Sequence, residues 1–332
     1  KIPGNGDIAI RNNIMYCDSY IDLVAMDISD PVDAKIVKRL EGIFPNPLDL
    51  ESQFSNPDKG IVVGYKERDT VITRTYSGDD NPVGNTIREI RPITADGGTP
   101  LRGGENRSYS NKGQTGIAGS MARFTIYSNY LYVIDRSTMH TFDIGNPPDP
   151  KPWNKIDIGW NIETIFPYKD KLFIGSTTGM YIYDNSTPWN PVRLSRFDHA
   201  RGCDPVVAND KYAYVTLRTG TRCRGNDNEL VIVDITNLEE PKLIKSYPMH
   251  GPAGIGVDGT TLLLCDGKAG LKVFDVDDPK DIQLKDWVSN LHTYDVIPLG
   301  KTAIVVGDDG LYQYDYTDPN NLKKLSMIPV KE

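Results

Sequence analysis

The chain has few cysteines and histidines, no long apolar stretch and no surplus of basic residues. Four Cys and four His are spread over 332 residues, and none shows the CxxC or Cys/His spacing of a zinc site. No apolar run approaches the roughly 20 residues that a transmembrane helix needs. With 37 Lys and Arg against 45 Asp and Glu, the net charge is −8. This charge argues against a nucleic-acid partner, because a phosphate backbone calls for a basic face.

Turn-forming residues, by contrast, are abundant. The 30 Gly, 23 Pro and 18 Tyr are typical of many short strands joined by tight turns. The length is sufficient for one large β domain with an ample core. The chain opens at Lys1 without a signal peptide, as expected of a sequence from which a leader has been removed or left out.

One short pattern occurs six times along the chain. Each copy has Leu or Met four residues before an Asp, and five of the six have Pro four residues after it; the copies end on Asp27, Asp143, Asp184, Asp234, Asp275 and Asp315. After the second copy the spacings are 41, 50, 41 and 40 residues, which indicates a repeat architecture. A carboxylate here can cap the following turn, and Pro prevents the strand from continuing. We therefore interpret these Asp residues as structural and not as calcium ligands.

Each repeat contains four strand-like segments separated by turn signals. In the fifth repeat these segments read AGIGVDG, TLLLCDG, GLKVFDV and IQLKDWV. Four antiparallel strands in a unit of about 40 residues predict the blades of an all-β propeller. Stacked helical repeats are excluded, because β-branched and aromatic residues fill the units and no 3.6-residue period is present.

The number of blades follows from the linkers between repeats. From Asp27 to the next inner strand at Arg123 there are 96 residues, whereas each later linker has 20. The excess of 76 fits neither one blade of about 41 residues nor two, and it shows one hairpin-like stretch, 59–76, and a polar run. We predict a single propeller domain over 1–332, with six blades and an insertion at 45–120 between blades one and two. Seven blades, with the hairpin as half of an irregular blade, is the alternative.

Both ends of the chain read as whole blades of four strands, 7–43 and 292–330. No strand borrowed from the other terminus is evident. We therefore expect the ring to close by side-chain packing between the first and last blades, or by a small exchange of strands.

The four cysteines are of two kinds. Cys17 and Cys265 lie in apolar strands, where a thiol packs as a small hydrophobic group. Cys203 and Cys223 both fall in the repeat that is lengthened to 50 residues. We predict a disulfide between them, which implies an oxidising compartment; free thiols are the alternative.

Several strings resemble the LVIVD-repeat family. They are LVIVD at 230–234, LKVFDVDDP, and the run GCDPVVANDKYAYVTLRTGTRCRGNDNELVIVDIT; GSMARFTI at 119–126 is similar to a blade entry of that group. The resemblance covers nearly all of the chain outside the insertion. It implies a propeller-type envelope or surface lipoprotein of Bacteroidetes-like bacteria, exported and anchored through an N-terminal cysteine that this chain lacks. It implies no activity, because function does not follow from fold.

The topology of a propeller places the candidate site. Inner strands begin on the face that also holds the turns between second and third strands and the linkers between blades. The predicted ligand-binding ring at this channel mouth comprises Asp7, Arg123, Glu163, Asp204 and Asp295, with the linker histidines His199 and His292. Second-strand turns add Asp18, Asp135, Asp266 and Asp308. We expect these carboxylates to be solvated in a hydrated channel, with a bound cation as the alternative; no cofactor is predicted.

No catalytic motif accompanies these residues: the chain has no GxSxG elbow and no Gly-rich phosphate cradle. The sequence favours a non-catalytic binding or scaffold protein of the bacterial envelope, whose partner is an envelope protein or a glycan. Aromatic residues could contact such a partner: Tyr109, Tyr127, Trp153, Trp160 and Trp189. The alternative is an enzyme that acts on polysaccharide or another envelope polymer through Asp204, Glu163 or Asp295, with or without a metal.

Overall fold

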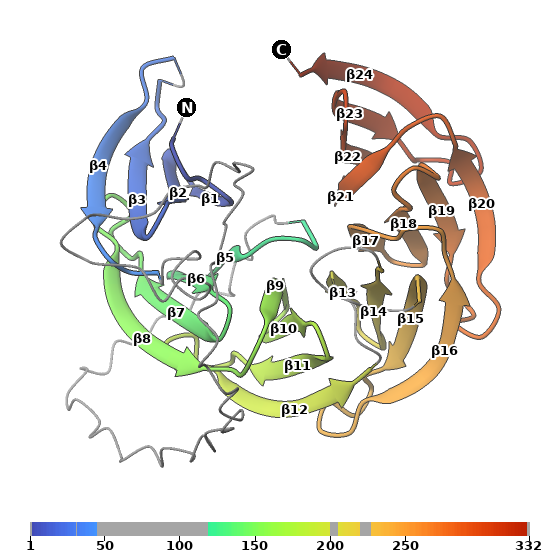
Figure 1. Cartoon of the computed structure of the whole chain (residues 1–332), viewed down its shortest axis with the longest axis horizontal. Helices are drawn as coiled ribbons and strands as arrows, with labels where there is room; N and C mark the ends of the chain where they lie inside the picture. The colour runs from blue at the N-terminus through green and yellow to red at the C-terminus, as the bar shows by residue number, and fades with distance from the viewer. Residues whose placement is uncertain (1, 31, 45–118, 200–204, 220–226, 331–332) are drawn as a thin grey trace, which may run out of the picture.

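Six four-stranded antiparallel sheets are arranged around a central channel (Figure 1). The computed structural model describes residues 2–30, 32–44, 119–199, 205–219 and 227–330. Each sheet is a simple meander in which consecutive strands are neighbours. The predicted all-β propeller with six blades is confirmed. The predicted insertion at 45–120 lies outside the described residues except for its last two.

We number the blades one to six along the chain, and within each blade the strands follow one another from channel to rim. Blades one to three comprise β1 (Ile8–Arg11), β2 (Ile14–Ser19), β3 (Asp22–Asp27), β4 (Lys35–Leu40); β5 (Phe124–Tyr127), β6 (Tyr130–Ile134), β7 (Thr138–Asp143), β8 (Lys151–Asp157); and β9 (Ile162–Tyr168), β10 (Lys171–Ser176), β11 (Gly179–Asp184), β12 (Val192–Asp198). Blades four to six comprise β13 (Val206–Ala208), β14 (Tyr212–Leu217), β15 (Glu229–Asp234), β16 (Lys242–Pro248); β17 (Ile255–Asp258), β18 (Thr261–Cys265), β19 (Leu271–Asp275), β20 (Gln283–Val288); and β21 (Thr293–Leu299), β22 (Thr302–Gly307), β23 (Gly310–Asp315), β24 (Lys323–Pro329).

The repeated Asp at the end of every third strand caps the turn that follows it. In all six blades its Oδ1 accepts the backbone N–H of the residue two positions later, at 2.7 to 3.2 Å. The hydroxyl of that later residue also lowers the pKa of Asp27, Asp234 and Asp315, because it stabilises the charged carboxylate. The structural interpretation of these residues is therefore confirmed.

Every outer strand carries a β-bulge at the same place. In each blade one residue of the outer strand has no partner on the third strand. In blades one to six this bulge residue is Val37, Trp153, Leu194, Ile244, Lys285 and Leu325. The next residue contacts the following blade at five junctions. Examples are Lys38 Nζ to Asp149 at 2.9 Å and Ser195 Oγ to the Leu238 carbonyl at 2.6 Å. In blade six the corresponding Ser326 bonds Gln313 of its own blade instead.

The core is divided among the junctions between blades. Five clusters of buried apolar side chains fill the five junctions between consecutive blades. Inner strands contact one another in the order β1, β5, β9, β13, β17, β21, and no comparable contact links β21 back to β1. Figure 1 shows the first and last sheets standing apart. The expected packing between them is therefore absent from the described residues.

The flanks of this opening differ from the closed junctions. The third strands of blades three and six, β11 and β23, show this difference. Every residue of β11 before its terminal Asp is buried, whereas exposed and buried residues alternate along β23. Leu311 and Val306 are paired on the exposed side of blade six, and Ile8 and Ile10 are exposed on blade one. Among the described residues, one face of each terminal blade thus lacks a neighbouring blade of the kind that covers the other blades.

Candidate functional site

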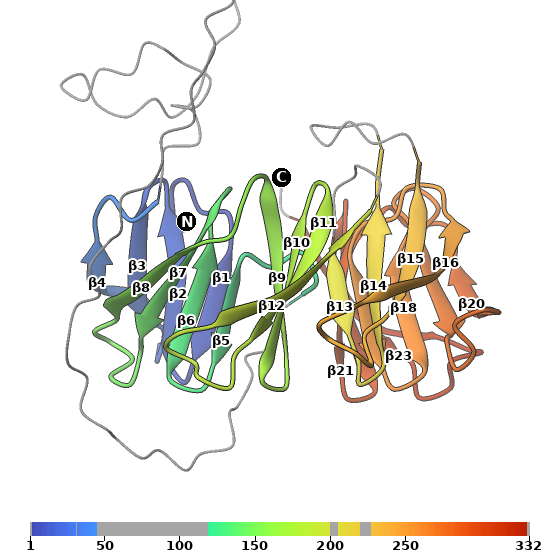
Figure 2. The same ribbon diagram turned by 90° about the horizontal axis from the view of Figure 1, so that it is seen from below.

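The predicted site lies on the face of the ring where the inner strands begin, which we call the mouth face. The linkers between blades and the turns between second and third strands lie on the same side; the first-to-second turns and third-to-fourth loops lie on the opposite side, the far face (Figure 2). Of the predicted ring residues, Asp7, Arg123, Glu163 and Asp295 are described. Asp204, Cys203 and Cys223 lie outside the described residues, so the disulfide stays a prediction.

Asp7 joins blade one to blade two. Its Oδ2 accepts the backbone N–H groups of Arg123 and of Phe124, the latter at 2.9 Å, and its Oδ1 accepts that of Ile8 at 2.7 Å. Burial raises the pKa of Asp7, and these backbone N–H groups oppose the rise. The structure therefore brings Asp7 and Arg123 together, but through the backbone of Arg123 and not through its guanidinium.

Asp295 is held by a segment that crosses the channel. Ser120 lies in the chain that leads into β5 of blade two, yet its hydroxyl donates to Asp295 Oδ1 at 3.1 Å and accepts the N–H of Ile255 at 2.8 Å. Figure 1 shows this segment running from β5 toward β17 and β21. The sequence predicted residues 119–126 as a plain blade entry and gave no sign of this crossing.

Glycine permits the close approach. A Cβ at Gly254 would lie 1.9 Å from Asp295 Oδ1, and one at Gly119 would lie 2.1 Å from Oδ2. Val296 N also donates to Oδ1 at 2.9 Å. Burial raises the pKa of Asp295 to about 6, and the charge of Asp7 adds to the rise. Asp7 and Asp295, which we call the channel carboxylates, thus serve mainly to bind backbone and Ser120 groups.

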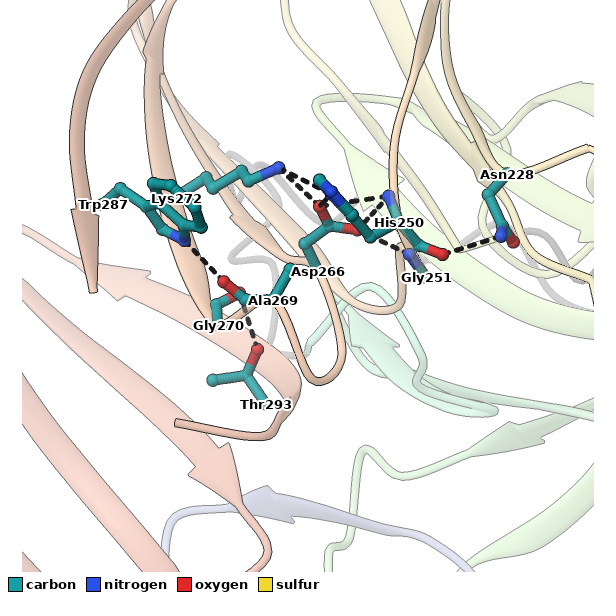
Figure 3. Close-up of polar contacts among 9 residues, drawn as sticks. All are labelled: Asn228, His250, Gly251, Asp266, Ala269, Gly270, Lys272, Trp287 and Thr293. Carbon is teal, nitrogen blue, oxygen red and sulfur yellow. Dashed lines mark hydrogen bonds and ion pairs between the residues drawn. The ribbon is translucent and has the colours of Figure 1, made fainter. Parts of the chain in front are cut away.

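A different arrangement surrounds Asp266, in the turn between β18 and β19 (Figure 3). Asp266 is fully buried and receives Lys272 Nζ at 2.6 Å. It also accepts the backbone N–H groups of His250 at 3.0 Å and Gly251 at 2.8 Å. Lys272 lies in the apolar strand β19 and is itself buried. A buried charge pair of this kind is tolerable because additional hydrogen bonds satisfy the carboxylate.

Two exposed rings contact this buried pair. The side chain of His250 is 72% exposed, and its Nδ1 lies 3.2 Å from Asp266 Oδ2 and 3.4 Å from Lys272 Nζ. Trp287, 47% exposed, has Lys272 Nζ 5.6 Å from its ring centroid, within range of a cation–π interaction. Its indole N–H donates to the Ala269 carbonyl. The buried pair therefore fixes the positions of an imidazole and an indole that face solvent.

A second polar group follows on blade six. His292 Nδ1 lies 2.5 Å from Asp308 Oδ2, and the Tyr294 hydroxyl bonds the other oxygen of Asp308. Thr293 ties this linker to the Asp266 turn, since its N–H and hydroxyl donate to the carbonyls of Gly267 and Gly270 at 3.0 Å each. We name the combined surface the blade five–six rim, defined by His250, Asp266, Lys272, Trp287, His292, Tyr294 and Asp308.

The remaining predicted residues are not gathered at this rim. His199 follows β12 at the junction of blades three and four, where its ring lies 6.4 Å from that of Phe197. Glu163 is half-buried on β9 of blade three. Within the described part of the chain, no group of three or more His, Cys, Asp or Glu side chains is arranged to hold a metal ion.

Sequence reasoning identified the Asp266 and Asp308 turns and His292, but it missed Lys272 and Trp287. A signal for Lys272 was present: LKVFD places one charged residue inside an otherwise apolar third strand.

Cys17 and Cys265 are buried free thiols, as predicted. Among the described residues there is no helix that is long and apolar enough to cross a bilayer.

Comparisons with known proteins agree on the fold. Residues 201–248 match the LVIVD repeat, so the chain contains this repeat within a β-propeller. No curated protein matches the sequence. A crystal structure from Lactobacillus plantarum is similar with a TM-score of 0.59 at 12% identity, over 96% of this chain and 83% of that one. A chain of the Mitotic Checkpoint Complex gives 0.55 at 10% identity, over 96% and 77%. Hsv2 of Kluyveromyces lactis gives 0.50 at 8%, over 95% and 74%.

Proposed function

We propose that this protein is a non-catalytic binding module of the bacterial envelope, which holds an envelope protein or a glycan on its mouth face at the blade five–six rim. The observation that carries the proposal is the contrast between the two sets of carboxylates. Asp7 and Asp295 are occupied by backbone N–H groups and Ser120. Asp266 also accepts backbone N–H groups, but it and Asp308 in addition hold the side chains of His250 and His292, which are exposed and partly exposed.

The chemistry of the rim suits recognition. Trp287 and Tyr294 are of the residue types that dominate binding hot spots, and His250 and His292 add ring nitrogens that donate or accept hydrogen bonds. Their positions are fixed from beneath by the buried Asp266–Lys272 pair and by the Thr293 bonds. A surface that is rigid before binding loses less conformational entropy when a partner docks.

The enzyme alternative has less support. Glycoside hydrolysis needs two carboxyl groups that reach the scissile bond from opposite sides. Asp295 carries the raised pKa expected of a general acid, but its oxygens already bond Val296 N–H and the Ser120 hydroxyl from the crossing segment. Asp7, whose charge acts on Asp295, is likewise engaged by the N–H groups of Ile8 and Phe124.

The envelope location rests on the sequence and not on the structure. It is supported by the LVIVD repeat at 201–248, together with the predicted Cys203–Cys223 disulfide. Export, a lipid anchor and the choice between a protein and a glycan partner all remain parts of the proposal.

Co-sedimentation with envelope fragments of a Bacteroidetes-like bacterium tests the proposal. The fragments are used intact, after protease digestion, and after periodate oxidation, which destroys the vicinal diols of glycans. We expect binding that one of the two treatments abolishes, and no release of reducing ends from the fragments. Absence of binding to intact fragments, or polymer cleavage that is lost in Asp295→Asn or Glu163→Gln, would overturn the proposal.

A further inference from the structure

Two identical tripeptides meet on the far face at the rim of blades two and three. Pro-Trp-Asn occurs at 152–154 in β8 and again at 188–190 in the loop between β11 and β12. Both indoles lie beside Tyr130: the ring centroid of Tyr130 is 6.2 Å from that of Trp153 and 6.5 Å from that of Trp189. We propose that Tyr130, Trp153 and Trp189, which we call the far-face aromatic site, bind the pyranose ring of a neutral carbohydrate.

The position of Trp189 is fixed by the repeat, but its identity is not. In all six blades the loop after the third strand contains the same four-residue turn, in which the fourth N–H donates to the first carbonyl; in blade three Asn190 N–H donates to Thr187 at 2.9 Å. The third residue of these turns is Val32, Pro148, Trp189, Glu239, Lys280 or Asn320. Turn formation therefore does not require an aromatic residue there.

Trp153 occupies a similarly free position. It is the bulge residue of β8, and the equivalent residues in other blades are aliphatic or Lys. A bulge re-aims the side chain it carries. Blade two alone places an indole at its bulge, and blade three alone places one in its turn, so that the two indoles flank the same tyrosine.

The site is rigid and open to solvent. Trp153 is 49% and Trp189 48% exposed, although burial of an indole is worth several kcal/mol in a packed core. The loop that carries Trp189 is fixed by the Tyr132 hydroxyl, which donates to the Pro188 carbonyl at 2.6 Å and lies 3.0 Å from Asn185 Oδ1. Aromatic rings held in place lose little entropy when they bind a ligand.

Polar groups of the right kind adjoin the rings. Asn154 follows Trp153, Asn190 follows Trp189, and the two amides are joined by an Nδ2 to Oδ1 hydrogen bond of 3.3 Å. An amide side chain offers both donors and acceptors, as the hydroxyl groups of a sugar require. The negative face of an aromatic ring attracts the partly positive C–H groups of a pyranose, by the same quadrupole that orders aromatic pairs.

A sugar ring fits this surface better than a protein partner does. A stable protein interface covers about 800 Å² on each side, whereas this site consists of three aromatic side chains and two amides. The tilts of 73° and 47° between Tyr130 and the two indoles present angled ring faces, not one flat plate. Small ligands bind such sets of aromatic rings when a few oriented polar groups adjoin them.

The four tryptophans of the chain allow a direct test. The protein is labelled with 5-fluorotryptophan, and each of the four fluorine signals is assigned from a Trp→Phe variant at Trp153, Trp160, Trp189 or Trp287. Cellohexaose, xylohexaose, mannohexaose and chitohexaose are titrated to about 10 mM, with sorbitol as an open-chain control. Trp160 is the matched control: it is 83% exposed and lies in the linker between blades two and three, on the mouth face.

We expect at least one oligosaccharide to shift the Trp153 and Trp189 signals saturably, while the Trp160 signal stays in place and sorbitol has no effect. Trp153→Ala should weaken this binding at least about tenfold, with unchanged Trp160 and Trp287 signals as evidence that the variant is folded. The proposal is overturned if no oligosaccharide shifts the two signals, if all four signals shift alike, or if they shift with protein concentration alone. This result is independent of the blade five–six rim, which Trp287 reports.

Discussion

The channel carboxylates and the carboxylates of the blade five–six rim share one face of the propeller but differ in what they contact. Asp7 accepts the N–H of Phe124 at the start of the neighbouring inner strand, whereas Asp295 accepts that of Val296 in its own strand and anchors the crossing segment through Ser120. Asp266 faces a buried lysine and an exposed histidine, and Asp308 faces a histidine and a tyrosine. Acidic residues gathered by one topology thus divide into those that only join parts of the ring and those that also hold exposed side chains in place.

The difference lies in the partner and not in the carboxylate. Every blade offers backbone N–H groups at the start of its inner strand, so a carboxylate that accepts them has a purely structural reason to be there. A lysine inside an apolar strand has no structural reason of its own, since replacing a buried ion pair by apolar residues of similar volume is often neutral or stabilising. We therefore infer that the Asp266–Lys272 pair is present because it supports the exposed rings of His250 and Trp287.

The largest effect is expected when the buried pair is broken. Asp266→Asn leaves Lys272 charged and buried without a counter-ion, which should lower the free energy of unfolding by about 3 to 5 kcal/mol. The double variant Asp266→Asn/Lys272→Met should recover most of this loss. Urea denaturation checks both; a loss below about 1 kcal/mol in the single variant, or no recovery in the double, would show that the pair is not a buried ion pair.

An intermediate effect is expected at the channel, and it depends on pH. The pKa of Asp295 rises from its ordinary value of 3.8 to about 6 in the folded chain. The folded state therefore binds this proton more tightly than the unfolded state, and the resulting stability is fully present below pH 3.8 and lost as pH rises through 6. The loss is about 3 kcal/mol.

In Asp295→Asn this fall between pH 4 and 6.5 should disappear, because the side chain no longer titrates. Thermal or urea unfolding of wild type and variant at several pH values measures it. The control is Asp27→Asn, whose parent carboxylate has a lowered pKa because of the Ser29 hydroxyl and so affects stability in the opposite direction. If the difference in free energy of unfolding between the wild type and Asp295→Asn did not vary with pH, burial of a titrating Asp295 at the channel would be contradicted.

The smallest effect on stability is expected from the exposed ring of the rim. His250→Ala removes a side chain that is 72% exposed and keeps the backbone N–H that Asp266 accepts, so the free energy of unfolding should change by less than about 1 kcal/mol. If His250→Ala destabilised the fold as much as Asp266→Asn, the histidine would be a structural residue and not a binding one.

Much of the fold could be predicted from the sequence, because the repeat is local. Asp27 and its five equivalents predicted both the strand ends and the turns, and the linker lengths gave six blades. The opening between β21 and β1 could not be predicted from the pattern, because the terminal blades show the same pattern of four strands as the blades between them. It depends on contacts between the two ends of the chain.

The candidate site could be predicted only in part, for a related reason. Spacing placed Asp7, Asp266 and His292 on the correct face, since topology alone decides the face. It could not show that Ser120 reaches across the channel to Asp295, nor that Trp153 and Trp189 converge on Tyr130. These contacts join residues of different repeats, and no periodicity within one repeat records them.

The most direct test of the proposed function compares the two regions in one assay. Affinity for envelope fragments is measured for the rim variant His250→Ala/Trp287→Ala, for the channel variant Asp295→Asn, and for Trp160→Ala as an exposed mouth-face control. We predict that the rim variant binds at least about tenfold more weakly, whereas the other two bind as the wild type does. Loss of binding in Asp295→Asn with full binding by the rim variant would contradict the account.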